Sequence, residues 1–210
     1  MTTTDNILID KPVIFDWDGT IVASVHGKAE CMKIALQKYQ IDERILSRSI
    51  LNKSGIRRDI KIKQILMECI GLKINESELS EILIEYSLLL NTATLNFNLI
   101  PGIAKFINNR TAVSIICSSA PQKEIEVNLS KISTCGNSVI IFPEVRNKIE
   151  QIKIIKTRFE DVAYMFGDSI EDYNSAKFNN LDFIGVCYDN PELKNRNDIK
   201  LIKTYNDLRY

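Results

Sequence analysis

The chain has 210 residues, of which 45% are hydrophobic and 26% are charged, so it can form one large hydrophobic core or a core domain with a small second lobe. Lysine plus arginine equals aspartate plus glutamate at 27 each, which leaves no net charge to attract nucleic acid or an anionic membrane. We therefore expect neither nucleic acid nor a membrane as a partner.

The N-terminal sequence MTTTDNILIDK has no signal-peptide pattern, and no apolar run approaches the roughly 18 residues that span a bilayer, so we expect a cytoplasmic protein. The five cysteines are scattered without a Cys-x-x-Cys pair, which favours reduced thiols. A single histidine, His26, excludes a multi-histidine zinc site. Any hydrolytic chemistry must therefore come from carboxylates.

Short apolar runs rich in β-branched and aromatic residues are typical of buried strands. They occur at residues 13–15, 113–117, 139–142, 162–166 and 183–187. Stretches of helical length, 122–131, 148–158 and 172–179, lie between the later runs. This alternation predicts an α/β fold with a parallel sheet and helices on both faces.

Residues 22–98 differ from the rest because they show helical periodicity and no convincing strand. Apolar residues recur at helical spacing in two stretches, Ile62, Ile65, Leu66, Cys69 and Ile70, and then Leu79, Ile82, Leu83, Tyr86, Leu89 and Leu90. The pattern predicts an all-helical insert of about four helices. Pro101-Gly102 is typical of the turn that leads back into the α/β core.

Two carboxylates directly follow the first predicted strand, in Asp16-Trp17-Asp18-Gly19-Thr20. Open α/β sheets bind their ligands at the carboxyl ends of such strands. Asp16 could attack phosphorus as a nucleophile, while Asp18 could protonate the leaving oxygen and later deprotonate the attacking water. A chance acidic turn is the alternative, but the four fixed positions match at random on the order of once in 10^5 positions.

Hydroxyl groups follow the run 113–117, in Ser118-Ser119-Ala120-Pro121. A hydroxyl and exposed backbone N–H groups at a strand end can bind phosphate oxygens. Serines before a proline are also ordinary helix N-caps, so both interpretations remain open.

Lys148 opens the predicted helix 148–158. Its ammonium group could neutralise the charge shared by a nucleophilic aspartate and a phosphoryl group. Lys153 and Lys156 compete for this role, and the order of motifs along the chain favours Lys148.

A second carboxylate pair follows the run 162–166, in Gly167-Asp168-Ser169-Ile170-Glu171-Asp172. Asp168 falls at a strand end and Asp172 one helical turn later, so both could face the same point. Mg²⁺ takes oxygen ligands and retains several waters, so one direct carboxylate and one that holds water would be enough beside Asp16. The alternative for Asp172 is a simple helix cap.

Together these segments resemble the haloacid dehalogenase superfamily in all four of its motifs, over the whole chain. The resemblance implies a Rossmann-like three-layer α/β sandwich formed by residues 1–21 and 99–210, with a parallel sheet. The small helical domain, residues 22–98, is inserted after the first strand. It is similar to the cap of phosphoglycolate-phosphatase-like and β-phosphoglucomutase-like members.

The resemblance also implies roles for the motif residues. Asp16 would be the nucleophile, and Mg²⁺ would be held by the Asp16 carboxylate, the Asp18 backbone carbonyl and Asp168. Asp172 would support the metal waters, and the phosphoryl group would be bound by Ser118, with Ser119 beside it, and by Lys148. Two departures, Trp17 and Ala23, touch no catalytic role.

The insert contains Ser54-Gly55-Ile56-Arg57-Arg58, a glycine turn followed by two guanidinium groups. In capped relatives a loop of this kind closes over the active site and contacts the leaving group of the substrate. Arginines suit a second anionic or polyhydroxyl group, which makes Gly55, Arg57 and Arg58 candidate specificity residues. A solvated helix start is the alternative.

The resemblance implies a Mg²⁺-dependent phosphatase, monomeric or homodimeric, that acts on a small phosphorylated metabolite such as a sugar phosphate, a sugar-acid phosphate or a phosphoglycolate-like compound. Haloalkanoate dehalogenation is disfavoured because relatives with that chemistry lack the equivalent of Asp18. Phosphonate cleavage needs a cap lysine, for which Lys53 is only a distant candidate. A sugar phosphomutase with the same residues and a catalytically silent binding module remain as alternatives.

Overall fold

The computed structural model describes residues 8–53, 56–132, 139–142 and 147–208. The chain divides into two compact units, each with its own core. Met1–Ala23 and Asn98–Tyr210 form the α/β unit, and Ser24–Phe97 forms the helical unit.

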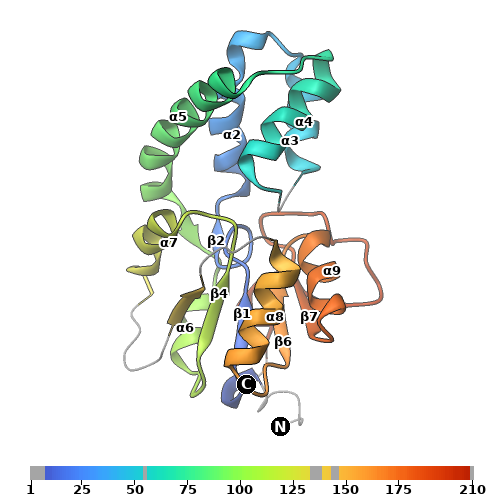
Figure 1. Cartoon of the computed structure of the whole chain (residues 1–210). Coiled ribbons are helices and arrows are strands. Elements are labelled where there is room, and N and C mark those ends of the chain that lie inside the picture. Colours follow the sequence, from blue (N-terminus) through green and yellow to red (C-terminus); the bar gives the residue numbers. More distant parts are fainter. Residues whose placement is uncertain (1–7, 54–55, 133–138, 143–146, 209–210) are drawn as a thin grey trace. The chain divides into compact units, whose positions relative to one another are not determined.

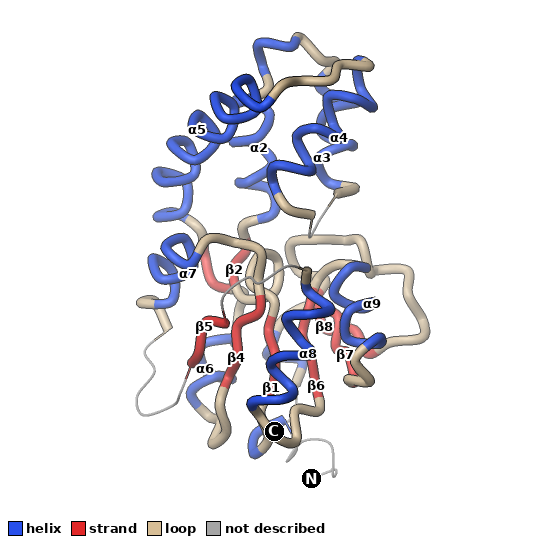
Figure 2. Tube along the Cα trace, in the orientation of Figure 1, coloured by secondary structure: helices blue, strands red, loops and turns tan. Residues whose placement is uncertain are grey.

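The α/β unit contains a six-stranded sheet in the order β5-β4-β1-β6-β7-β8, in which all neighbouring strands are parallel. Its strands are β1 (Val13–Phe15), β4 (Ser114–Cys117), β5 (Val139–Phe142), β6 (Tyr164–Gly167), β7 (Asp182–Val186) and β8 (Lys200–Ile202). Its helices are α6 (Ile103–Asn108), α7 (Gln122–Leu129), α8 (Lys148–Arg158) and α9 (Ile170–Phe178). Figures 1 and 2 show α8 on one face of the sheet and α6 on the other. The predicted α/β class is confirmed.

Both faces of β1 are buried, which explains why this strand is a continuous apolar run. Ile14 packs in a cluster with Ile152 and Ile155 of α8. Phe15 points to the opposite face, because successive side chains of a strand alternate. Its ring stacks on Phe166 with centroids 5.1 Å apart.

The strand order places the candidate site. The chain runs from β1 outward through β4 and β5, and then returns to the other side of β1 at β6. Parallel sheets bind ligands at the carboxyl ends of the strands where the order reverses. Asp16 directly follows β1, and Asp168 directly follows β6.

Short elements depart from the sequence prediction. No strand was expected within residues 22–98, but β2 (Val22–Ala23) and β3 (Asn98–Leu99) form an antiparallel pair at both edges of that range. That expectation was wrong there, because two residues are too few to show a strand period. β8, with three residues, and α6, with six, were also not expected, because neither shows a clear period.

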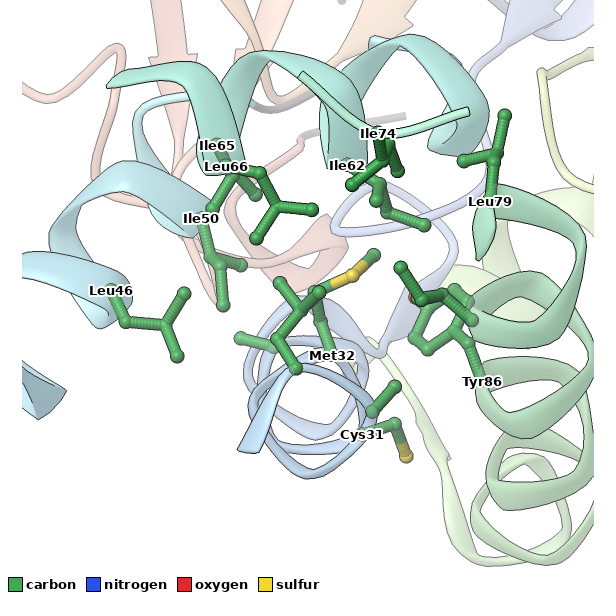
Figure 3. Packing of buried hydrophobic residues seen from close by; sticks show 14 of the residues in the cluster. Cys31, Met32, Leu46, Ile50, Ile62, Ile65, Leu66, Ile74, Leu79 and Tyr86 are labelled. Carbon is green, nitrogen blue, oxygen red and sulfur yellow. The ribbon is translucent and has the colours of Figure 1, made fainter. Parts of the chain in front are cut away.

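The helical unit contains α2 (Val25–Ala35), α3 (Glu43–Leu51), α4 (Arg58–Ile70) and α5 (Glu76–Ala93), together with 3-10 turns at Gln37–Tyr39 and Thr94–Asn96. Each α-helix contributes buried apolar side chains to one core, including Met32, Ile50, Leu66 and Tyr86 (Figure 3). The α-helices described in this unit agree with the expected number of about four. None of the helices in the described ranges combines the length and apolar character needed to cross a bilayer.

Candidate active site

A tight turn fixes the first motif beyond β1. The Asp16 N–H donates to the Phe166 carbonyl on β6 at 2.9 Å, which continues the sheet pairing. The Trp17 carbonyl then accepts from the N–H groups of residues 20–22 at 2.9 to 3.3 Å. Gly19 has a φ of 76°, a left-handed conformation that glycine adopts without strain. The turn therefore leaves the buried Asp16 side chain at the carboxyl edge of the sheet.

Lys148 is the lysine that the fold brings to Asp16. It is the first residue of α8, and its side chain is 5% exposed. Its Nζ lies 2.8 Å from Asp16 Oδ1 and 2.5 Å from Asp172 Oδ1. Of its competitors, Lys153 is exposed, and Lys156 donates to the Asn179 carbonyl.

Asp172 acts both as part of a helix cap and as an ion-pair partner. Ser169 is the N-cap of α9, and Asp172 completes a capping box with it. Asp172 Oδ2 accepts from the Ser169 hydroxyl at 2.6 Å and from the backbone N–H groups of Asp168 and Ser169. Its Oδ1 accepts from Lys148. The helix-cap interpretation of Asp172 therefore agrees with the structure, and the support of metal-bound waters stays a prediction.

Gly167 allows this close approach of Asp172 to the end of β6. A Cβ atom at position 167 would lie 2.4 Å from Asp172 Cβ and 2.7 Å from its Cγ. Cβ atoms essentially never lie so close to other atoms, so any side chain at position 167 would force the strand end or the helix start to move.

Three buried carboxylates converge at this edge of the sheet. Asp16, Asp168 and Asp172 each offer an oxygen atom, and these atoms lie within 4.8 Å of one another. A hard cation such as Mg²⁺ prefers a set of oxygen ligands, so this donor set fits it. Because both oxygens of Asp172 already accept hydrogen bonds, Asp16 and Asp168 are the better candidates for direct contact.

The electrostatics of the cluster reflect its burial and the crowding of negative charge. Burial raises the pKa of Asp16 to about 7, although the Lys148 ammonium opposes this shift. Burial also raises the pKa of Asp168 well above its ordinary value, and the charges of Asp16 and Asp172 add to this effect. Burial alone would lower the pKa of Lys148, but the two carboxylates beside it raise that pKa well above its ordinary value.

Ser118 lies at the carboxyl edge of the adjacent strand. Since Phe15 of β1 is paired with Ile116 of β4, the residue two positions beyond Ile116 reaches the same edge as Asp16. Ser118 is buried, and its Oγ accepts from the Ala120 N–H at 3.1 Å, a bond that does not use its hydroxyl hydrogen. The N-cap of α7 is Pro121, so neither serine is that cap, and Ser119 is half-buried.

Two groups of predicted residues lie outside the carboxylate cluster. Asp18 is half-buried within the turn after β1, where it forms a β-bridge with Val22. In the helical unit, Arg57 pairs with Asp59 at 3.2 Å, and Arg58 lies 5.4 Å from the centre of the Tyr86 ring. Gly55 lies outside the described residues.

Asn190 is the residue at this site that the sequence reasoning missed. It is 4% exposed and lies between β7 and β8, and its side-chain amide donates to Asp168 Oδ2 at 2.9 Å. Asn190-Pro191 is typical of a turn and carries no chemical signal of its own. Its position just beyond a predicted strand could have identified it as a residue of the same sheet edge.

Comparison with known proteins agrees with this geometry. The family model for haloacid dehalogenase-like hydrolases matches residues 13–186, so the chain belongs to that family of hydrolases. The predicted membership of the superfamily is confirmed. No curated protein is similar enough in sequence to count as a match.

Among solved structures, a hydrolase from Pseudomonas syringae has a TM-score of 0.76 at 19% identity, over 94% of this chain and 95% of that one. A predicted phosphatase from Clostridium acetobutylicum has a TM-score of 0.70 at 23% identity, over 93% and 94%. A predicted phosphoglycolate phosphatase from Haemophilus somnus has a TM-score of 0.70 at 15% identity, over 94% and 95%. At these identities the similarity establishes the Rossmann-like fold expected from the sequence.

Proposed function

We propose that the chain is a Mg²⁺-dependent phosphatase that hydrolyses a small phosphorylated metabolite through an aspartyl-phosphate on Asp16. The observation that carries the proposal is the position of Asp16 at the end of β1. Lys148 donates a hydrogen bond to one of its carboxylate oxygens, and Asp168 and Asp172 each offer an oxygen within 4.8 Å of an Asp16 oxygen. The names of two similar structures, a predicted phosphatase and a predicted phosphoglycolate phosphatase, support the same class.

The proposed first step is attack of an Asp16 carboxylate oxygen on phosphorus. The bond from phosphorus to the leaving oxygen breaks, and Asp18 donates its proton to that oxygen. Lys148 neutralises negative charge on Asp16 and on the phosphoryl group. The Ser118 hydroxyl donates a hydrogen bond to a phosphoryl oxygen, and the backbone near Ser119 contributes further hydrogen-bond donors.

In the second step Asp18 takes a proton from water, and the water oxygen attacks the phosphorus of the aspartyl-phosphate. This releases inorganic phosphate and restores the Asp16 carboxylate. Asp16 and Asp168, with the Asp18 backbone carbonyl, would hold Mg²⁺ directly, and Asp172 would support its waters. Bound Mg²⁺ would offset the repulsion between the carboxylate and the phosphate dianion.

We assign substrate specificity to Gly55, Arg57 and Arg58 of the helical unit. Arg57 is exposed, and its ion pair with Asp59 lies at the surface, where water screens such pairs, so an anionic group of a substrate can compete for its guanidinium. Arg58 is half-buried against Tyr86, which fixes the direction of its side chain.

The test is phosphate release from an aryl phosphate with Mg²⁺ and with EDTA, for the wild type, Asp16→Asn and Asp182→Asn. Asp182 is exposed at the amino end of β7, which makes it a matched control at the opposite edge of the sheet. We expect Mg²⁺-dependent release by the wild type and by Asp182→Asn. Asp16→Asn should lose at least about 10^3-fold of turnover, which corresponds to about 4 kcal/mol. Release that is unaffected by EDTA would refute the role of the metal.

Phosphate release and product analysis together separate the alternatives. A silent binding module would release no phosphate from any substrate. A sugar phosphomutase would convert sugar phosphates to isomers faster than it releases phosphate, so product analysis on a panel of sugar phosphates distinguishes it from a phosphatase.

A further inference from the structure

Asn190 is a buried amide that touches a candidate metal ligand at two atoms. Its Nδ2 donates to Asp168 Oδ2 at 2.9 Å and lies 3.3 Å from the Asp168 backbone carbonyl. Its Oδ1 accepts from the Glu192 N–H at 3.1 Å, which closes a turn of the type that asparagine favours. Both ends of the amide are therefore held, and the donor end is directed at Asp168.

The segment that carries Asn190 is fixed to the α/β unit beyond this contact. Leu193 is fully buried and packs in the core between the sheet and its helices. Arg196 pairs with Asp198 at 2.6 Å, and its guanidinium lies 4.4 Å from the centre of the Tyr173 ring. The Tyr173 hydroxyl also donates to Asp198 at 3.0 Å. Since Tyr173 is on α9 directly after Asp172, the segment and the helix of the second motif are held together.

We propose that Asn190 is a positioning residue that orients the Asp168 carboxylate and thereby sets the affinity of the site for Mg²⁺; the inference rests on the proposed function. A carboxylate can rotate about its Cβ–Cγ bond, and the hydrogen bond to Oδ2 prevents this rotation. It thereby favours Oδ1 as the oxygen that would bind a cation. Groups that hold a metal ligand in this way commonly change metal affinity by about 10-fold to 100-fold when they are removed.

The variants Asn190→Ser and Asn190→Ala test this proposal with Mg²⁺ alone as the probe. Serine can keep the turn to Glu192 but is too short to reach Asp168, so it removes the orienting contact with less damage to the fold. The measurement is Tm against Mg²⁺ concentration. We expect the Mg²⁺ concentration that gives a fixed rise in Tm above the value in EDTA to increase roughly 10-fold for both variants.

Asn179→Ala is the matched control. Asn179 lies at the other end of α9, where its amide donates to the Ile149 and Ser175 carbonyls at 3.1 and 2.9 Å. This variant also loses two side-chain hydrogen bonds, so its Tm in EDTA should fall as that of Asn190→Ala does. Its Mg²⁺ dependence should match the wild type.

The possible outcomes separate this inference from the proposed function. If Mg²⁺ raises the Tm of the wild type but not of Asp168→Ala, and the Asn190 variants titrate like the wild type, the positioning role is wrong and the metal site stands. If Mg²⁺ has no effect on the wild type, both the metal site and the role of Asn190 are wrong. A right-shifted titration for the Asn190 variants but not for Asn179→Ala supports the inference.

Discussion

Asp16 and Asp18 have different surroundings, although one residue separates them in the sequence. Asp16 is 6% exposed and pairs with Lys148, whereas Asp18 is half-buried and contributes no oxygen to the carboxylate cluster. This difference suits a nucleophile that must stay fixed and an acid-base group that must exchange protons with substrate and water.

Asp18→Asn should therefore affect substrates according to their leaving groups. An alkyl phosphate needs a proton on its leaving oxygen, so kcat/KM should fall about 10^2-fold to 10^4-fold. An activated aryl phosphate needs little protonation and should lose much less. Steady-state kinetics with both substrates measure the contrast, and equal losses would mean that Asp18 is not the proton donor.

The raised pKa of Asp16 predicts how Mg²⁺ binding depends on pH. Because burial raises this pKa to about 7, the carboxylate of the metal-free protein gains a proton as the pH falls through 7. Mg²⁺ needs the ionised form and must displace that proton, so its affinity should fall by up to about tenfold for each pH unit below 7. Titrations of Tm with Mg²⁺ at pH 6, 7 and 8 measure this dependence. Affinity that is constant or higher at pH 6 would contradict the assignment.

Most residues of the candidate site could be predicted from the sequence, because each motif directly follows a recognisable strand or begins a helix. The order of motifs along the chain alone favours Lys148 over Lys153 and Lys156, and the contact of Lys148 with Asp16 agrees with this prediction. Asn190 carries no local chemical pattern, because its amide acts through a contact with Asp168 that is distant in the sequence, and only its position just beyond the predicted strand 183–187 points to this sheet edge.

At the scale of elements, the junction between β6 and α9 controls the position of Asp172. Gly167→Ala would place a Cβ 2.4 Å from Asp172 Cβ, so either the strand end or the helix start must move. We expect the variant to lose about 1–3 kcal/mol of stability and a large part of kcat. Denaturant unfolding and kinetics measure the two effects.

A double-mutant cycle with Asp172→Ala checks the cause of the kinetic effect. If Gly167→Ala acts by displacing Asp172, its effect on kcat should largely vanish when Asp172 is already alanine. An undiminished effect in that background would show that the displaced group is another one.

Elements with a helical period or a continuous apolar run followed their sequence patterns, while β8 and α6 did not. The expected helix 148–158 matches the bounds of α8, and the run 139–142 matches β5. α9 begins at Ile170, two residues before the expected start, because the Ser169 cap satisfies its first turn. β8 has three residues and α6 has six, so neither shows a clear period.

At the scale of the whole molecule, all members of the carboxylate cluster belong to the α/β unit. Mg²⁺ alone should therefore slow amide hydrogen exchange in the turn after β1 and in the first turn of α9. Exchange in α3 and α5 of the helical unit should not change, because those helices have a core of their own. Mass spectrometry of exchanged peptides measures both units at once, and protection confined to α3 or α5 would contradict this metal site.

The proposed mechanism depends above all on transfer of the phosphoryl group to the Asp16 carboxylate. The most direct measurement is rapid quenching of the enzyme during turnover, reduction with borohydride and peptide mass spectrometry, because borohydride converts an aspartyl-phosphate to homoserine. We expect homoserine at position 16 in the wild type, and more of it in Asp18→Asn, where hydrolysis of the intermediate is impaired. Phosphate release by the wild type with no modification at position 16, or with modification at another carboxylate, would contradict it.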